Sequence, residues 1–355
     1  MEVLAGQIDH FKPSYVSVAD EEARQQLLAR LDAMGVRQPA EIGVGRQGAV
    51  RAAGWPEADT VLAAITGFAG LEPVLAAASA GKKIALANKE SLVVAGEEVK
   101  RRAAMSGAWL LPVDSEHSAI WQCMLAAPSG SVSRVILTCS GGPFHGKSAE
   151  ELRLVTAAEA LSHPTWTMGG KITVDSATLM NKAFEVIEAC HLFDLDHRAI
   201  DIVIHRQSMV HSMVEFTDGA LMAQLGPPDM TIPIRFALTF PNRSATVKRP
   251  PFDLLAPGHR AWTFEAVDED LFPTLAMARQ AFDRGGLMPL VLNAANEAAL
   301  ALFLEGAVAF TSIFDLVRRA LDDFSHLSAK KASSFDAMMS AHRRVTDHVR
   351  AAGLV

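Results

Sequence analysis

The stretch Lys171–Glu188, KITVDSATLMNKAFEVIE, decides how the rest of the chain is organised. It opens with a short β-type run, Ile172–Val174, and the cap-type residues Asp175 and Ser176 follow. From Ala177 the spacing of apolar residues changes to that of a helix. The sequence therefore predicts a strand, a turn and then a helix that begins at Ala177.

The predicted helix has two unlike faces, because successive helical residues are about 100° apart. Apolar side chains on one face predict a buried contact: Leu179, Met180, Ala183, Phe184, Val186 and Ile187. The other face carries Asn181, Glu185 and Glu188, with Lys182 at its edge. Such a polar stripe is typical of a solvated helix face and equally of a binding site. The Ser176 hydroxyl and the free N–H groups of the first turn predict an anion site, to which Lys182 adds a charge.

A second acidic stretch favours the binding site. The apolar run Trp109–Val113 ends abruptly in Asp114-Ser115-Glu116-His117. Open α/β sheets hold their ligands where buried parallel strands end. Asp114 and Glu116 could point the same way, and Glu185 would complete a three-carboxylate site for Mg²⁺ or Mn²⁺.

Composition limits the class of protein. The chain has 355 residues, a net charge of −7, 50% hydrophobic residues and 21% charged residues, values typical of a soluble globular protein of two or three domains. The net charge argues against a nucleic-acid surface, and no apolar run is long enough to span a membrane. Cys123, Cys139 and Cys190 lack CxxC spacing, which argues against a disulfide framework and fits a cytoplasmic protein.

Strands and helices alternate with short connections up to Val113, which predicts a parallel, doubly wound sheet. The predicted strands are residues 15–18, 41–44, 60–66, 83–87 and 109–113. No G-x-G-x-x-G turn occurs near the N-terminus, although such sheets usually bind dinucleotides through one.

The middle of the chain carries two glycine-containing loops. A strand at residues 132–138 leads into Cys139–Phe144, whose glycines allow the backbone to approach a ligand. His163–Gly170 carries Trp166 and Met168 and could form a lid over a site. A surface loop that folds Trp166 onto the core is the simpler interpretation. Residues 209–216 and 220–225 predict a hairpin, and we expect His205 and His211 to be structural hydrogen-bonding residues.

The remainder predicts an extended connection followed by helices. Prolines from Pro227 to Pro251 mark the connection, and helical patterns follow at residues 273–284, 292–304, 313–323 and 335–352. The predicted fold class is α/β, with a Rossmann-like N-terminal domain, a central α+β catalytic domain and a C-terminal helical bundle. Their predicted boundaries are residues 1–114, 115–240 and 268–355, with a linker at 241–267.

Several motifs follow one another in a fixed order. They are Asn88-Lys89-Glu90-Ser91, Val113-Asp114-Ser115-Glu116-His117, Ser140-Gly141-Gly142-Pro143-Phe144, His163-Pro164-x-Trp166-x-Met168-Gly169-x-Lys171-Ile172, Val174-Asp175-Ser176-Ala177-Thr178-x-Met180-Asn181-Lys182, Ile204-His205-x-Gln207-Ser208-x-x-His211-Ser212-Met213-Val214, Gln224-Leu225-Gly226-x-Pro228-Asp229-Met230 and Leu292-Asn293-Ala294-Ala295-Asn296-Glu297. In these motifs the chain resembles the 1-deoxy-D-xylulose 5-phosphate reductoisomerase family, and the resemblance covers nearly its whole length.

The resemblance implies an activity. Members of the family rearrange 1-deoxy-D-xylulose 5-phosphate and reduce it with NADPH to 2-C-methyl-D-erythritol 4-phosphate, a step of isoprenoid synthesis by the methylerythritol phosphate pathway. It also implies Mn²⁺ or Mg²⁺ as a cofactor, a sugar phosphate as the substrate and a homodimer. We expect no nucleic-acid or membrane partner.

The resemblance also implies roles for individual residues. The metal ligands are expected to be Asp114, Glu116 and Glu185. The substrate-binding residues are expected to be Lys89, Ser115, Glu116, Ser140, His163, Ser176, Asn181, Lys182 and Glu185, of which Lys89, Glu116, His163 and Glu185 are catalytic. Trp166 and Met168 are expected on the lid, and Asn88, Glu90 and Gly169 against NADPH. Glu188 is expected to support the metal site rather than to bind the ion.

One departure bears on the cofactor. The family's Gly-rich phosphate-binding turn, with its first strand and helix, has no counterpart here, so we expect an incomplete, truncated NADPH-binding domain. Either the start of the chain is mis-assigned or truncated, or this form cannot bind NADPH normally. We favour the first because every substrate and metal position is kept. The alternatives are a cofactor-independent sugar-phosphate isomerase or aldolase-like protein, and a ligand-binding relic without turnover.

Overall fold

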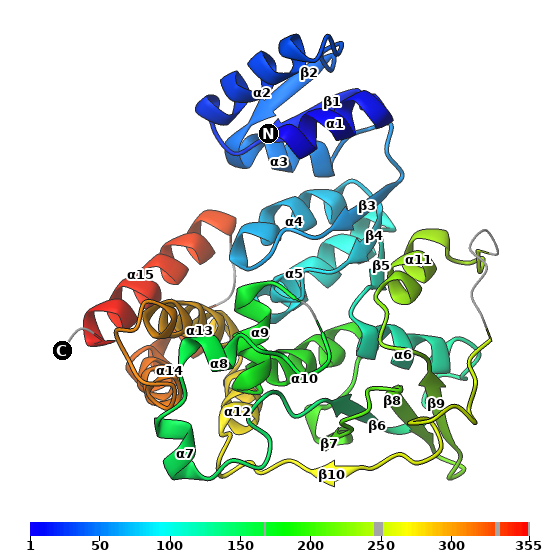
Figure 1. Cartoon of the computed structure of the whole chain (residues 1–355), viewed down its shortest axis with the longest axis vertical. Helices are drawn as coiled ribbons and strands as arrows, with labels where there is room; N and C mark the ends of the chain where they lie inside the picture. The colour runs from blue at the N-terminus through cyan, green and yellow to red at the C-terminus, as the bar shows by residue number, and fades with distance from the viewer. Residues whose placement is uncertain (167, 245–250, 331–333, 354–355) are drawn as a thin grey trace.

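A computed structural model describes residues 1–166, 168–244, 251–330 and 334–353 (Figure 1). Thr167 of the predicted lid and Lys248–Pro250 of the predicted connection lie outside these residues. None of the described helices combines the length and the apolar character needed to cross a membrane.

The first elements form a small lobe, drawn in blue at the top of Figure 1. They are α1 (Glu2–Phe11), β1 (Tyr15–Val18), α2 (Glu21–Ala33), β2 (Glu41–Val44) and α3 (Gly45–Ala53). β1 and β2 pair in parallel, and Ala5, Leu27 and Leu31 are fully buried between sheet and helices. The Asp20 side chain accepts a hydrogen bond from the Ala23 N–H, so the predicted start of α2 is confirmed.

A second parallel sheet follows in the chain. It consists of β3 (Thr60–Ala63), β4 (Lys83–Leu86) and β5 (Trp109–Pro112), connected through η1 (Phe68–Gly70), α4 (Leu71–Ser79) and α5 (Glu90–Ser106). The α/β class with parallel sheets is confirmed. The parallel strands fall into two separate sheets, because no described strand joins the β1–β2 pair to β3.

The central part contains a mixed sheet with the strand order β10-β7-β6-β8-β9. Its elements and their connections are α6 (Ser115–Met124), β6 (Val132–Cys139), α7 (Ala149–Arg153), α8 (Ala157–Ala160), η2 (His197–Ala199), β7 (Ile200–Ile204), β8 (Val210–Phe216), β9 (Leu221–Leu225) and β10 (Glu265–Ala266). β8 and β9 are antiparallel neighbours, which confirms the predicted hairpin. β10 pairs with β7, so the end of the predicted linker belongs to this sheet.

The stretch Lys171–Glu188 is helical almost throughout, which corrects the prediction of a strand at Ile172–Val174. α9 spans Gly170–Ala177 and α10 spans Met180–Phe193, with a break at Leu179, whose φ is 58°. The β-branched residues are accommodated because Val174 is buried and the Thr173 hydroxyl donates to the Gly169 carbonyl. The predicted helix start at Ala177 is also wrong.

The proline-containing connection is likewise not extended throughout. α11 (Thr231–Thr239) lies within it, with Pro233 in its first turn. The first N–H groups of a helix have no partner inside the helix, so a proline there removes no hydrogen bond.

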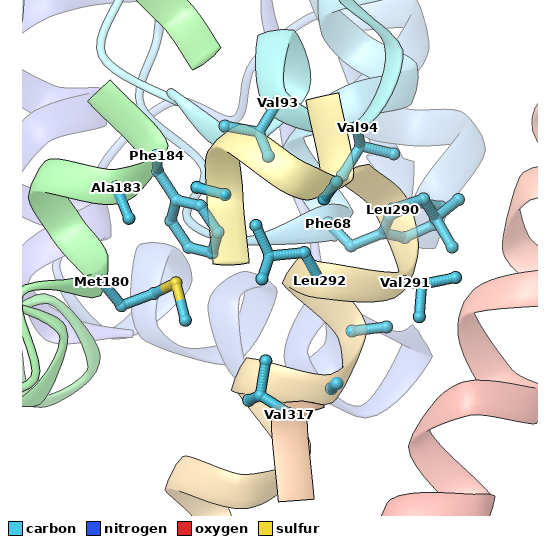
Figure 2. Packing of buried hydrophobic residues seen from close by; sticks show 14 of the residues in the cluster. Phe68, Val93, Val94, Met180, Ala183, Phe184, Leu290, Val291, Leu292 and Val317 are labelled. Atoms are coloured by element: carbon cyan, nitrogen blue, oxygen red, sulfur yellow. The ribbon is translucent and has the colours of Figure 1, made fainter. Parts of the chain in front are cut away.

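The C-terminal part is helical, as predicted. It consists of α12 (Thr274–Arg284), α13 (Met288–Leu304), α14 (Ser312–Asp323), η3 (Ser325–Ala329) and α15 (Phe335–Gly353). α10 packs against both α5 and α12, so it joins the N-terminal and C-terminal parts. Figure 2 shows Phe184 and Met180 of α10 in one core with Val93 of α5 and Leu292 of α13. The predicted domain boundaries stay a prediction.

A polar network crosses this core beside α9. The Lys171 ammonium donates to Glu90 Oε1 at 2.7 Å and to Asp175 Oδ2 at 2.8 Å. Asn296 of α13 donates to the other oxygen of Asp175 at 2.6 Å. Burial lowers the pKa of Lys171, but attraction by Asp175 and Glu90 outweighs that effect and leaves the pKa raised.

We predict that Lys171→Met lowers the free energy of unfolding by about 3 kcal/mol, because two neighbouring carboxylates lose their shared cation. Lys100→Met, which removes an ion pair to the exposed Asp194, is the matched control and should cost about 0–1 kcal/mol. Urea unfolding followed by circular dichroism measures both values. Equal losses for the two variants would contradict the structural role of Lys171.

Candidate active site

A pocket of about 260 Å³ lies at the carboxyl ends of β4, β5 and β6, against α9 and α10. Most of the predicted site residues line it: Lys89, Asp114, Ser115, Glu116, Ser140, His163, Trp166, Met168, Ser176, Asn181 and Lys182. Glu185 lies fully buried beside them. Asn88, Glu90 and Gly169, predicted to contact NADPH, lie outside the lining.

Three carboxylates converge at one end of the pocket. Asp114 and Glu116 follow β5, and Glu185 reaches them from α10. One oxygen atom from each lies within 4.8 Å of the others. Ligands about 2.0–2.6 Å from a shared cation can be that far apart, so one hard ion can reach all three.

Two ammonium groups lie among these carboxylates. Lys89 forms an ion pair with Asp114 and donates to Asn181 Oδ1 at 2.7 Å. Burial lowers the pKa of Lys89, but attraction by Asp114 and Glu185 outweighs it and leaves the pKa well above its usual value. Lys182 contacts Glu116 at 2.9 Å and also Glu185. Its predicted contact with an anion therefore stays a prediction.

His117 and Glu188 form a buried pair behind the three carboxylates. His117 Nε2 lies 2.9 Å from the Glu185 carbonyl oxygen and therefore donates to it. Its Nδ1 lies 3.2 Å from Glu188 Oε2, within ion-pair distance. Burial raises the pKa of Glu188 to about 7, against the attraction of His117. The bond from His117 to the Glu185 carbonyl oxygen ties α6 to the part of α10 that carries Glu185, and the supporting role of Glu188 stays a prediction.

The charges and donor atoms fit one divalent cation. Four carboxylates (Asp114, Glu116, Glu185 and Glu188) face two ammonium groups (Lys89 and Lys182), which leaves a formal charge of −2. Burial, and then repulsion by Glu116, raise the pKa of Glu185 to about 8. A divalent cation would relieve this repulsion, and an all-oxygen ligand set suits Mg²⁺ or Mn²⁺.

The opposite end of the pocket carries neutral hydrogen-bonding groups. His163 Nδ1 accepts the N–H groups of Thr165 and Trp166 at 3.1 and 2.9 Å. Its Nε2 must therefore carry the proton, and it lies 3.2 Å from Ser140 Oγ and 3.1 Å from Ser176 Oγ. Burial, and then the charge of Arg206, lower the pKa of His163 and keep it neutral.

The structure corrects the predicted helix boundaries around the expected anion site. Ser176 lies in the last turn of α9 rather than at a helix start, while Asn181 and Lys182 occupy the first turn of α10. The groups that lie close together are the hydroxyl groups of Ser140 and Ser176 and the N–H group of His163. Donors of this kind suit an anionic group of the size of a phosphoryl group, and an anion site here stays a prediction.

The two histidines expected to be structural form hydrogen bonds to the backbone, and both also line the pocket. His205 Nε2 accepts the Met209 and Val210 N–H groups, and His211 Nε2 lies 3.2 Å from the Gly226 carbonyl oxygen. The sequence interpretation overlooked Arg206, whose guanidinium binds the loop after β6. No periodicity marks this residue, and its adjacency to His205 was the one available signal.

A hard-cation site of three carboxylates beside a site for a phosphoryl group, at strand ends of an α/β fold, defines a class: a metal-assisted enzyme acting on a small phosphorylated compound. Family comparisons give the particular member of that class. Residues 1–96 match the model described as 1-deoxy-D-xylulose 5-phosphate reductoisomerase, and residues 110–193 match that described as its C-terminal domain. Residues 225–348 match the DXP reductoisomerase C-terminal domain. The chain belongs to the 1-deoxy-D-xylulose 5-phosphate reductoisomerase family.

Individual similar proteins and solved structures support the same family membership. The reductoisomerase of Symbiobacterium thermophilum is 52% identical over 322 residues, which are 91% of this chain and 82% of the relative. That of Gloeobacter violaceus is 47% identical over 99% of this chain and 87% of the relative. The solved structure of the Zymomonas mobilis enzyme in complex with NADPH is 39% identical, with a TM-score of 0.89 over 99% of this chain and 89% of that one. A DOX-P reductoisomerase in complex with NADPH, fosmidomycin and magnesium is 39% identical and superposes with a TM-score of 0.90 over 99% and 88% of the two chains.

We predict that Mn²⁺ affinity rises with pH up to about 8. Because the pKa of Glu185 is raised to about 8, its carboxyl group is protonated at neutral pH, and the cation must displace that proton. The apparent affinity should fall about tenfold per pH unit below pH 8 and level off above pH 9.

Isothermal titration in buffers of different ionisation enthalpy measures both the affinity and the proton release. Glu185→Gln should weaken binding and remove the pH dependence. Glu98→Gln, which alters a carboxylate on the far side of α5, is the control and should behave as the wild type. A wild-type affinity independent of pH would contradict the assignment.

Proposed function

We propose that this chain converts 1-deoxy-D-xylulose 5-phosphate to 2-C-methyl-D-erythritol 4-phosphate, using NADPH and a divalent cation. The observation that carries the proposal is the convergence of Asp114, Glu116 and Glu185 within 4.8 Å, at a pocket that the hydroxyl-bearing residues Ser140 and Ser176 also line. Family membership supports it, as do the NADPH and magnesium in the similar solved structures.

The residues would divide the substrate between two ends of the pocket. Ser140, Ser176 and His163 would hold the phosphoryl group through neutral hydrogen bonds. Asp114, Glu116 and Glu185 would hold the cation beside the hydroxy-ketone end. When bound, the cation supplies Lewis acidity toward the substrate oxygens and NADPH supplies the hydride. Lys89, already paired with Asp114 and Asn181, would hold a proton and a positive charge at that end.

The residues proposed to contact NADPH lie next to the lid segment. No described atom lies within 4 Å of where a Cβ would stand on Gly169, so a ligand can approach its backbone. Glu90 is joined to Asn88 at 3.0 Å and to Lys171 at 2.7 Å, which places the proposed cofactor residues against the start of α9. Trp166 and Met168, expected on the lid, line the same pocket as Ser140, His163 and Ser176.

The comparisons favour this function over a cofactor-independent isomerase, an aldolase-like protein or a relic without turnover. Following NADPH absorbance with 1-deoxy-D-xylulose 5-phosphate and Mn²⁺ separates these possibilities. We expect oxidation of one NADPH per substrate consumed. Rearrangement of the substrate without oxidation would support the isomerase, and binding without turnover would support the relic.

We predict that Glu185→Gln lowers kcat/KM by at least about a thousandfold, because losing a metal ligand removes several kcal/mol of assistance. The fold should persist, because the glutamine amide has nearly the shape of the glutamate carboxyl group. The raised pKa of Glu185 also means that a neutral side chain suits this buried place. Thermal unfolding checks the fold, and Glu98→Gln serves as the matched control. A rate like that of the wild type would remove Glu185 from the site.

We further propose a cytoplasmic homodimer. Cys123, Cys139 and Cys190 are free thiols, which supports a reducing compartment. β9 is an edge strand of the mixed sheet and exposes Leu221 and Met222, so a second copy can cover its apolar residues by pairing along this edge.

We predict that Met222→Asp shifts the protein from dimer to monomer, because a carboxylate would lie in the apolar contact. Size-exclusion chromatography with light scattering measures the mass, and Met105→Asp, at an exposed residue of α5, is the control. A dimer that persists in Met222→Asp at low concentration would place the interface elsewhere.

A further inference from the structure

Resting on the proposed function, we infer that Arg206 is a positioning residue for phosphoryl binding, acting through the loop Ser140–Gly142. One guanidinium nitrogen, Nη1, donates to the carbonyl oxygens of both Ser140 and Gly142, each at 2.9 Å. Arg206 itself lies in the turn between β7 and β8, so it connects two separate parts of the mixed sheet around the pocket.

The loop needs such an external restraint. Gly141 and Gly142 are both in the left-handed region, with φ of 78° and 69°. Glycines have no side chain to hold that conformation, and ordering them costs more entropy than ordering other residues. A Cβ on Gly142 would lie 2.7 Å from the Ser176 carbonyl oxygen, so no larger residue could replace it without a shift. The Arg206 hydrogen bonds supply the restraint that the sequence of the loop lacks.

Fixing the loop determines where the Ser140 proton can go. The Ser140 hydroxyl oxygen accepts the Gly142 N–H at 3.2 Å and lies 3.2 Å from the protonated Nε2 of His163. The His163 Nε2–H, which also faces Ser176 Oγ at 3.1 Å, and the Gly142 N–H are both donors, so neither can accept the Ser140 O–H. That proton is available to an anion in the pocket, which Ser140 lines. Arg206 thus orients a donor that it does not touch.

The support behind Arg206 is itself rigid. His205 Nδ1 lies 3.0 Å from the Thr263 carbonyl oxygen, and its Nε2 accepts the N–H groups of Met209 and Val210 at 3.1 and 3.2 Å. Ser208 in the same turn has a φ of 51°. These bonds hold the β7–β8 turn in one conformation, so the Arg206 guanidinium starts from a fixed backbone.

The guanidinium binds carbonyl groups rather than a carboxylate: within the described part of the chain Arg206 forms no ion pair. Its positive charge is therefore not neutralised locally. A bare charge would also attract an anion from a distance, so the experiment must separate that effect from positioning. Salt does so, because it screens an attraction between exposed charges but leaves a short hydrogen bond largely intact.

The test compares Arg206→Ala with Arg198→Ala, an exposed arginine paired with Asp196 away from the loop. Binding of inorganic phosphate, followed by ³¹P NMR line width, and steady-state kinetics are measured at about 0.05 M and about 0.5 M salt. We expect Arg206→Ala to weaken phosphate binding and raise KM by about tenfold, with kcat within about threefold, because two hydrogen bonds from a charged donor are lost. The ratio to wild type should be the same at both salt concentrations.

The results that would contradict the role of Arg206 can be told apart from the expected result. Values for Arg206→Ala like those of Arg198→Ala, a defect that disappears at high salt, or no phosphate binding by the wild type would each overturn the inference. If Arg206→Ala does not fold, Arg206→Gln keeps one donor without the charge; we expect a smaller, salt-independent defect, and wild-type affinity would overturn the inference. A wild type that binds phosphate but does not oxidise NADPH would refute the proposed function and leave this inference standing.

Discussion

The structure depends on burying several negative charges in one place. Asp114, Glu116, Glu185 and Glu188 lie around two lysines. With all four carboxylates ionised the cluster would carry two excess negative charges away from water, which either protonation of Glu185 or a bound cation reduces. The surrounding elements can be understood as a frame for this cluster. β5 delivers two of the carboxylates, and the fully buried polar side of α10 delivers the other two, while its apolar side joins α5 and α13 in the main core (Figure 2).

The two ends of the pocket use different physical means. The metal end relies on charge. Burial and repulsion by Glu116 raise the pKa of Glu185, whereas burial lowers the pKa of Lys89 and attraction by Asp114 and Glu185 outweighs that effect. The phosphoryl end relies on neutral donors, with His163 held in one tautomer by backbone N–H groups. Excess negative charge among the carboxylates would repel a phosphoryl group, so the proposed arrangement puts that group at the neutral donors and the cation at the carboxylates.

The metal end could be predicted from the sequence because it follows simple geometric rules. Carboxylates directly after an apolar strand, and a polar stripe at helical spacing, are visible in the residues themselves. The phosphoryl end was less accessible. Ile172–Val174 has the composition of a strand, yet it is helical because it has no strand to pair with and because Val174 packs into the core. Pro233 likewise suggested an extended segment, although a helix tolerates it in the first turn. Arg206 acts through two carbonyl oxygens distant in sequence, a contact that no local pattern encodes.

The most direct measurement is the position of Mn²⁺ in a crystal of this protein, located by its anomalous scattering. The account predicts one ion, bound by an oxygen atom from each of Asp114, Glu116 and Glu185, with the His117–Glu188 pair intact behind it. An ion held instead by Asp114, His117 and Glu188, which also lie within 4.8 Å of one another, would contradict it. So would a crystal grown in Mn²⁺ that shows no anomalous peak among these carboxylates.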